Sequence, residues 1–136
     1  MEKEFTIQQV ATMTHLSEHT LRYYERIGLL AAIDRDNNGY RKYSMSDVTR
    51  IEFLRCLRST GMPIQKMQRY MDLLHQGQQT ANERRLLLVA HHQEVQAHIT
   101  ESQHYLEMIT RKIASYETLP QEQTAHPAAD ARIEDL

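Results

Sequence analysis

Residues 17–30 read SEHTLRYYERIGLL, a pattern that predicts a short amphipathic helix. Ser17 is a suitable N-cap, because its hydroxyl can accept a hydrogen bond from a free backbone N–H group, and Gly28 marks the helix end. Leu21 and Tyr24 lie three residues apart and predict a buried stripe. The opposite face is polar and consists of His19, Thr20, Arg22, Tyr23 and Arg26.

A second short helix is expected just before this one. Thr6 can cap it, and Ile7, Val10 and Ala11 fall on one face of a helix of about two turns. Residues 14–17 break the pattern and supply a tight turn. Two short helices joined in this way, the second with a polar outer face, are typical of the DNA-binding helix-turn-helix.

The following segment, residues 34–43, reads DRDNNGYRKY and predicts a small β-wing. Its Asn-Gly pair at positions 38 and 39 favours a two-residue type I′ hairpin turn. In the outgoing strand Tyr40, Arg41 and Lys42 present aromatic and basic groups, which suit phosphates and sugar edges. The alternative interpretation is a solvent-exposed hairpin that contacts no DNA, which accounts for the same residues.

Two further helices are expected before a very long one. Ser46 and Asp47 begin a helix that Gly61 ends, and another lies between Pro63 and Gly77. The methionines on the second of these fit a core better than a cofactor site.

Neither Pro nor Gly interrupts residues 80–116, where spacings of four and three alternate as in a coiled coil. This spacing gives the helix a narrow apolar stripe, here called the seam. The seam needs a partner, and a second copy of the chain is the natural one. Polar seam residues would lower stability and set the register. The expected dimer interface is Leu88, His92, Val95, Ile99, Ser102, Leu106, Ile109, Ile113 and Tyr116.

Charge and composition restrict the function further. Residues 1–77 hold 11 Lys and Arg against 9 Asp and Glu, whereas residues 78–136 hold 5 against 9. A mildly basic front half suits a polyanion. No apolar run approaches the roughly 18 residues of a membrane span, and no secretory signal is evident, so we expect a cytoplasmic protein without a membrane partner.

An enzymatic function is not expected, because the sequence has no Gly-rich phosphate loop, nucleophile–base pair or paired carboxylate motif. The expected organisation is a DNA-binding domain with a helix pair in residues 1–77, a dimerisation helix in residues 78–117 and a disordered tail in residues 118–136.

Four stretches of the sequence resemble the MerR family of regulators. They are TIQQVA at 6–11, LRYYERIGLL at 21–30, NGYRKY at 38–43 and FLRCLRSTGM at 53–62. The resemblance implies a mainly α fold, with a winged helix-turn-helix followed by a long antiparallel coiled-coil helix. It also implies a homodimer on a palindromic operator, with the second helix in the major groove and the wing along the backbone.

Carried over by position, the residues expected to contact DNA are Thr20, Arg22, Tyr23, Tyr40, Arg41 and Lys42. Tyr24 is equally well explained as a core aromatic. MerR-like activators act on promoters whose spacer is too long for RNA polymerase, and they bend and untwist the DNA to bring both promoter elements into register. This chain is therefore expected to be an activator with double-stranded promoter DNA, its own copy and RNA polymerase as partners.

The signal is less constrained by the sequence. Metal-sensing relatives carry cysteines at the ends of the dimer helix, and this chain has none there, so neither a metal nor another cofactor is expected. The single cysteine, Cys56, lies between Arg55 and Arg58 in a stretch similar to the subgroup that answers aldehydes and other thiol-reactive electrophiles, in a stress response. Alternatives stay open: Cys56 only packs and another small molecule is sensed, or the chain is a coiled-coil adaptor that binds protein.

Overall fold

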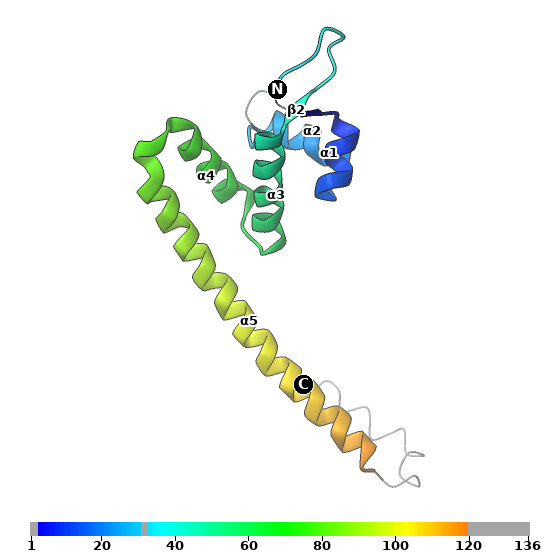
Figure 1. The fold of residues 1–136 in the computed structure, drawn as a ribbon. Helices are drawn as coiled ribbons and strands as arrows, with labels where there is room; N and C mark the ends of the chain where they lie inside the picture. Colours follow the sequence, from blue (N-terminus) through cyan, green and yellow to red (C-terminus); the bar gives the residue numbers. More distant parts are fainter. Residues whose placement is uncertain (1–2, 31–32, 120–136) are drawn as a thin grey trace. The chain divides into compact units, whose positions relative to one another are not determined.

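The computed structural model describes residues 3–30 and 33–119, so the expected tail lies outside the description from residue 120 onward. Figure 1 shows a mainly helical chain. In order, the elements are β1 (Glu4–Phe5), α1 (Ile7–Thr14), α2 (Glu18–Arg26), β2 (Tyr43–Ser44), α3 (Met45–Ser59), α4 (Ile64–Gln76), a 3₁₀ turn η1 (Gln78–Thr80) and α5 (Ala81–Glu117). No helix in the described ranges has the length and apolarity to cross a membrane.

The caps expected for α1 and α2 are present. Thr6 and Gln9 form a reciprocal capping box, with each side chain accepting from the other's backbone N–H at 3.1 and 2.9 Å. Ser17 accepts from the backbone N–H of Thr20 at 3.0 Å. His15, with φ of 59°, makes the tight turn between the two helices.

The hairpin after α2 differs from the expected type I′ turn. A type I′ turn needs positive φ at both Asn38 and Gly39, but in this hairpin only Gly39 has it, at 85°. The side chain of Asp36 accepts from the backbone N–H groups of Asn38 and Tyr40, at 2.9 and 3.0 Å. The backbone N–H of Asp36 donates to the carbonyl of Tyr40 at 2.9 Å, so the loop consists of the three residues 37–39, in which only the last, Gly39, needs a positive φ.

A small sheet connects the base of the hairpin to the start of the chain. β1 pairs with β2 in antiparallel register, with Phe5 opposite Tyr43. The next helix, α3, begins at Met45, one residue before the predicted Ser46. Its cap is Ser44, because this hydroxyl and the Asp47 carboxylate form a second capping box.

One core holds the helices of the front unit together. Its buried members come from α1, α2, β2, α3 and α4 and from the segments that follow α2 and α3, and Leu87 and Leu88 of α5 pack against it. The chain divides into two compact units between Val95 and Gln96, beyond the boundary expected at Gly77. The second unit contains the rest of α5, which is a single helix of 37 residues. The predicted fold class, a helix-turn-helix with a small wing and a long C-terminal helix, is confirmed.

Replacement of the α3 cap tests this account of the junction. We expect Ser44→Ala to lower the free energy of unfolding by about 1 kcal/mol, because the backbone N–H of Asp47 loses its acceptor. Ser46→Ala is the matched control, since Ser46 is exposed two residues further on. Urea denaturation of both variants measures the difference, and equal losses would contradict the capping role.

Candidate nucleic-acid interface

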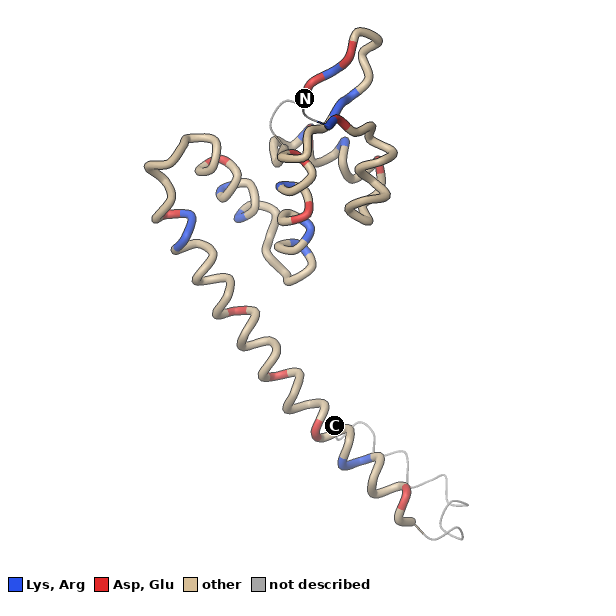
Figure 2. The backbone as a smooth tube through the Cα atoms, in the orientation of Figure 1, with Lys and Arg blue, Asp and Glu red and all other residues tan. Residues whose placement is uncertain are grey.

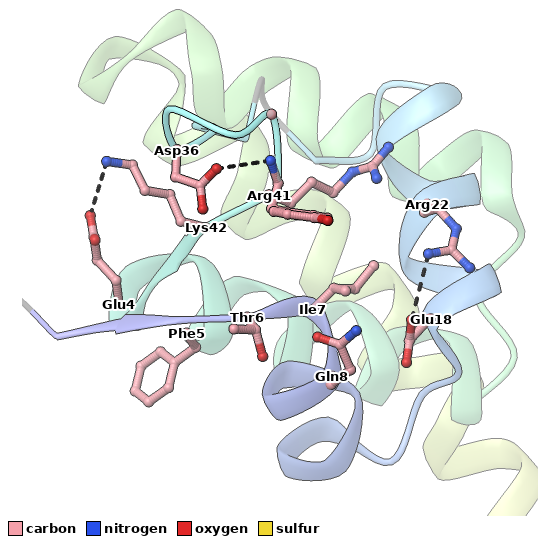
Figure 3. A pocket seen from close by; sticks show the side chains of 12 residues that line it. Glu4, Phe5, Thr6, Ile7, Gln8, Glu18, Arg22, Asp36, Arg41 and Lys42 are labelled. Atoms are coloured by element: carbon pink, nitrogen blue, oxygen red, sulfur yellow. Dashed lines mark hydrogen bonds and ion pairs between the residues drawn. The ribbon is translucent and has the colours of Figure 1, made fainter.

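A groove of about 690 Å³ lies where the start of the chain, α2 and the hairpin meet. Four of the six residues expected to contact DNA line it together, namely Arg22, Tyr40, Arg41 and Lys42. Figure 3 shows three of these side chains around the groove, Arg22 on α2 and Arg41 and Lys42 on the hairpin, with Arg22 directed toward Glu18 and Lys42 toward Glu4. The helix-turn-helix and the wing thus form one continuous surface.

Arg22 stands on the exposed face of α2. The Ser17 cap fixes where α2 begins, and Leu21 and Tyr24, both fully buried, orient the helix. Arg22 Nη1 lies 3.6 Å from Glu18 Oε1, one turn earlier on the same face. Because 45% of the Arg22 side chain is exposed, its guanidinium remains accessible to a phosphate.

The hairpin residues differ from one another in exposure. Tyr40 is 71% exposed, and Lys42 Nζ lies 3.4 Å from a carboxylate oxygen of Glu4 on β1. Arg41, by contrast, is mostly buried, and its Nε donates to a carboxylate oxygen of Glu25 on α2. This ion pair attaches the wing to α2, so Arg41 has a structural contact that the sequence pattern did not reveal.

Tyr43 lies beneath this surface. Its ring is fully buried, and burial raises the pKa of its hydroxyl above the usual value, although the nearby Arg41 guanidinium opposes the shift. The hydroxyl therefore stays neutral across the physiological pH range. Tyr43 supports the wing through packing and adds no charge to the groove.

The other two expected contact residues, Thr20 and Tyr23, line a second and smaller hollow with Arg58. Thr20 Oγ1 accepts from the Ser17 hydroxyl at 2.9 Å, and the Arg26 guanidinium lies 5.5 Å from the Tyr23 ring centre. The neighbouring Tyr24 belongs to the core, and its hydroxyl accepts from Arg58 Nη1 at 3.1 Å.

Cys56 is exposed on α3, one turn before Thr60. The Thr60 hydroxyl donates to the carbonyl of Cys56 at 2.9 Å, and it also lies 2.7 Å from His91 Nε2 on α5. The end of α3 that carries the cysteine is thus hydrogen-bonded to the first part of α5.

The expected dimer seam begins on a covered surface and continues on an open one. Leu88 packs against the core of the front unit, and Val95 is half-buried. Beyond them, Ile99, Leu106, Ile109, Ile113 and Tyr116 are between 47% and 61% exposed. His92 and Ser102 are exposed as well. Within residues 3–30 and 33–119, no group of His, Cys, Asp and Glu is arranged to hold a metal ion.

Comparisons with known proteins agree with this geometry. The profile "MerR HTH family regulatory protein" matches residues 5–74, and "MerR, DNA binding" matches residues 48–112. The HTH-type transcriptional regulator AdhR of Bacillus subtilis is 39% identical over 82 residues, which are 60% of this chain and 59% of AdhR. The chain thus spans less than two thirds of the length of that relative.

Two solved structures are similar over most of the chain. A MerR family transcriptional regulator from Listeria monocytogenes has a TM-score of 0.80 and 30% identity, covering 97% of this chain and 99% of its own. HiNmlR, a MerR family regulator lacking the sensor domain and bound to promoter DNA, has a TM-score of 0.78 and 30% identity. The match covers 85% of this chain and 91% of the HiNmlR chain.

Fold, groove and comparisons together define a DNA-binding transcriptional regulator with a winged helix-turn-helix, a class of proteins that regulates rather than catalyses. Within that class, the chain belongs to the MerR family.

Truncation of the exposed groove cations tests their expected role. An operator duplex can be selected from random sequence by binding to the wild-type protein. We expect Arg22→Ala and Lys42→Ala each to weaken binding and to reduce the log–log salt dependence of affinity by about 0.9, the value for one lost phosphate contact. Fluorescence anisotropy at several salt concentrations measures both quantities.

Arg69→Ala is the matched control, because Arg69 is an exposed, ion-paired arginine on α4 outside the groove. It should leave affinity and salt dependence unchanged. If neither groove variant differs from this control, the groove is not the DNA-binding surface. Arg41→Ala is less informative, since it leaves the mostly buried carboxylate of Glu25 without its partner.

Proposed function

We propose that this chain is a homodimeric transcription activator that binds operator DNA through α2 and the hairpin wing and responds to thiol-reactive electrophiles through Cys56. The observation that carries the DNA-binding part is that Arg22, Arg41 and Lys42, from α2 and the hairpin, line one groove. The bound promoter DNA of HiNmlR, a relative of similar fold, supports the same assignment.

In the proposed complex, α2 enters the major groove and the wing follows the phosphate backbone. The exposed outer face of α2 supplies Arg22 and Tyr23, and the exposed Tyr40 and Lys42 supply contacts from the wing. Each copy presents one such surface. Two copies related by a two-fold axis would therefore read a palindromic operator.

Pairing of copies is proposed to occur along α5. Five large apolar side chains beyond Val95 follow the four-and-three spacing and are about half exposed. Such a stripe is favourable only when a partner covers it. An antiparallel coiled coil with a second copy covers it and allows two DNA-binding units in one assembly.

The dimer is tested with two charges placed in the seam. We expect the double variant Ile99→Glu with Leu106→Glu to be monomeric in sedimentation velocity and to lose binding to the full operator, because burial of two carboxylates in an apolar interface is costly. Ala97→Glu with His104→Glu is the control, since both residues are exposed and lie opposite the seam, also seven residues apart. A dimer that persists in the seam variant excludes this interface.

The proposed regulatory step is distortion of a promoter with an over-long spacer, so that RNA polymerase can engage both of its elements. Smooth bending of DNA over a site of this size costs on the order of 1 to 6 kcal/mol. A signal therefore needs to shift the balance between two dimer states by only a similar amount.

Cys56 is proposed as the receptor of the signal. The thiol is exposed, which makes it accessible to a small electrophile. With an aldehyde, sulfur bonds to the carbonyl carbon and the thiol proton ends on the carbonyl oxygen, giving a hemithioacetal without any further reagent. The Thr60 hydroxyl donates to the backbone carbonyl of Cys56 and is hydrogen-bonded to His91 Nε2, which provides a physical route from the modified turn to α5.

The sensor assignment predicts a separable phenotype. A small aldehyde should raise transcription from the target promoter in vitro with the wild-type protein, whereas Cys56→Ser should bind the operator with unchanged affinity and show no increase. Single-round transcription with purified RNA polymerase measures the response. A response of Cys56→Ser equal to that of the wild type would reject the thiol as the receptor and leave DNA binding unaffected, so the signal would have to be a different small molecule.

A further inference from the structure

The charges that line the groove cancel. Three basic side chains lie there, and so do three acidic ones, Glu4, Glu18 and Asp36. Figure 2 shows acidic and basic residues together along the hairpin and at its base. A surface that binds duplex DNA normally carries a clear positive excess, because phosphate neutralisation supplies most of the non-specific affinity. The neutrality of this groove therefore needs a physical reason.

Two of the acidic groups close to the groove have local structural contacts. The side chain of Asp36 accepts two backbone hydrogen bonds inside the hairpin loop. Glu25 on α2 holds the groove residue Arg41 in an ion pair in which the side chains of Glu25 and Arg41 are only 19% and 22% exposed. These contacts explain why both carboxylates are present.

Glu4 and Glu18 differ, because their ion pairs are open to solvent. The side chains of the Lys42–Glu4 pair are 36% and 55% exposed, and those of the Arg22–Glu18 pair are 45% and 38% exposed. Exposed pairs of this kind contribute little to folding stability. A phosphate that approaches closely can therefore replace either carboxylate without a large cost.

We propose that Glu4 and Glu18 are specificity-determining residues that suppress binding to non-operator DNA. The inference rests on the proposed function, in which this groove faces DNA. Non-specific binding depends almost entirely on attraction between cations and phosphates, so cations neutralised by their own carboxylates attract bulk duplex weakly. At the operator, close contacts with the bases hold phosphates against Arg22 and Lys42, and these phosphates replace the carboxylates.

The test compares two double variants of equal charge. Glu4→Gln with Glu18→Gln frees one lysine and one arginine inside the groove. Glu83→Gln with Glu94→Gln frees Arg69 and Lys66 outside it, from pairs whose side chains are also open to solvent, at 57% to 59% exposed. Affinities for the selected operator and for a scrambled duplex of the same length are measured from 0.05 to 0.3 M salt, about the range in which phosphate contacts dominate.

We expect the groove variant to bind the scrambled duplex roughly 3- to 10-fold more tightly at about 0.1 M salt, with a steeper salt dependence. Its operator affinity should rise less, so the ratio of the two affinities falls. The control variant should change neither. Thermal unfolding of both variants checks that the fold is retained, since Glu18 also lies in the first turn of α2.

Three results overturn the proposal. In the first, the groove variant binds the scrambled duplex no more tightly than the control variant does. In the second, its affinities for the operator and the scrambled duplex rise equally. In the third, its operator affinity falls, which would mean that Glu18 reads a base directly. The alanine variants of Arg22 and Lys42 separate this failure from failure of the proposed function. If they lose operator binding while the glutamine variant shows no change in specificity, only the role of the carboxylates is rejected.

Discussion

The burial of two side chains, Leu21 and Tyr24, orients α2, the helix to which the wing is also attached through the Arg41–Glu25 pair. Both are completely inaccessible to solvent, and each buried side chain of this size contributes about 1.5 to 3 kcal/mol to folding. Because they fix the rotation of α2 about its axis, Arg22 and Tyr23 must face outward. The hydrogen bond from Arg58 to the Tyr24 hydroxyl extends the constraint to α3. A change in this packing would turn the whole outer face of the helix.

The wing depends on the same helix through electrostatics rather than apolar packing alone. The Arg41–Glu25 pair joins the hairpin to α2, and the buried ring of Tyr43 supports it from below. Loss of one partner of a shielded pair is costlier than loss of an exposed one, because the remaining charge is left poorly solvated. The position of the wing relative to α2 is therefore better defined than a short two-stranded hairpin alone would allow. Hairpin residues and helix residues act as one surface for this reason.

Local signals made most of the fold predictable from the sequence. Thr6 and Ser17 act within three residues of their hydrogen-bond partners, and Gly28 and Gly61 have the positive φ expected after a helix end. The predicted type I′ turn was wrong. The Asp36 side chain accepts hydrogen bonds from the backbone N–H groups of Asn38 and Tyr40, and the hairpin loop has three residues instead of two. The start of α3 was misplaced because Ser44 caps it rather than Ser46.

The candidate site was less predictable, because its details depend on contacts distant in sequence. The partners Glu4 and Lys42 are far apart in the chain, as are Glu25 and Arg41, and no periodicity encodes either pair. Helical register, however, was informative: Val48, Ile51, Leu54 and Leu57 form the buried stripe of α3. Cys56 is outside this stripe, which explains its exposure.

The two parts of α5 face different physical situations although they form one helix. None of its 37 residues is buried, but Leu87 and Leu88 near its start are covered by the front core, and the Thr60–His91 and Lys66–Glu94 contacts add polar ties there. Residues after Val95 lack such cover within the described part of the chain, and yet they retain large apolar side chains at regular spacing. In a helix exposed to solvent on all sides, that spacing would not increase stability. These apolar groups lie where the described chain offers no core, and this is the physical basis for inferring a second copy. Leu88 belongs to the same seam but packs against the core of the front unit.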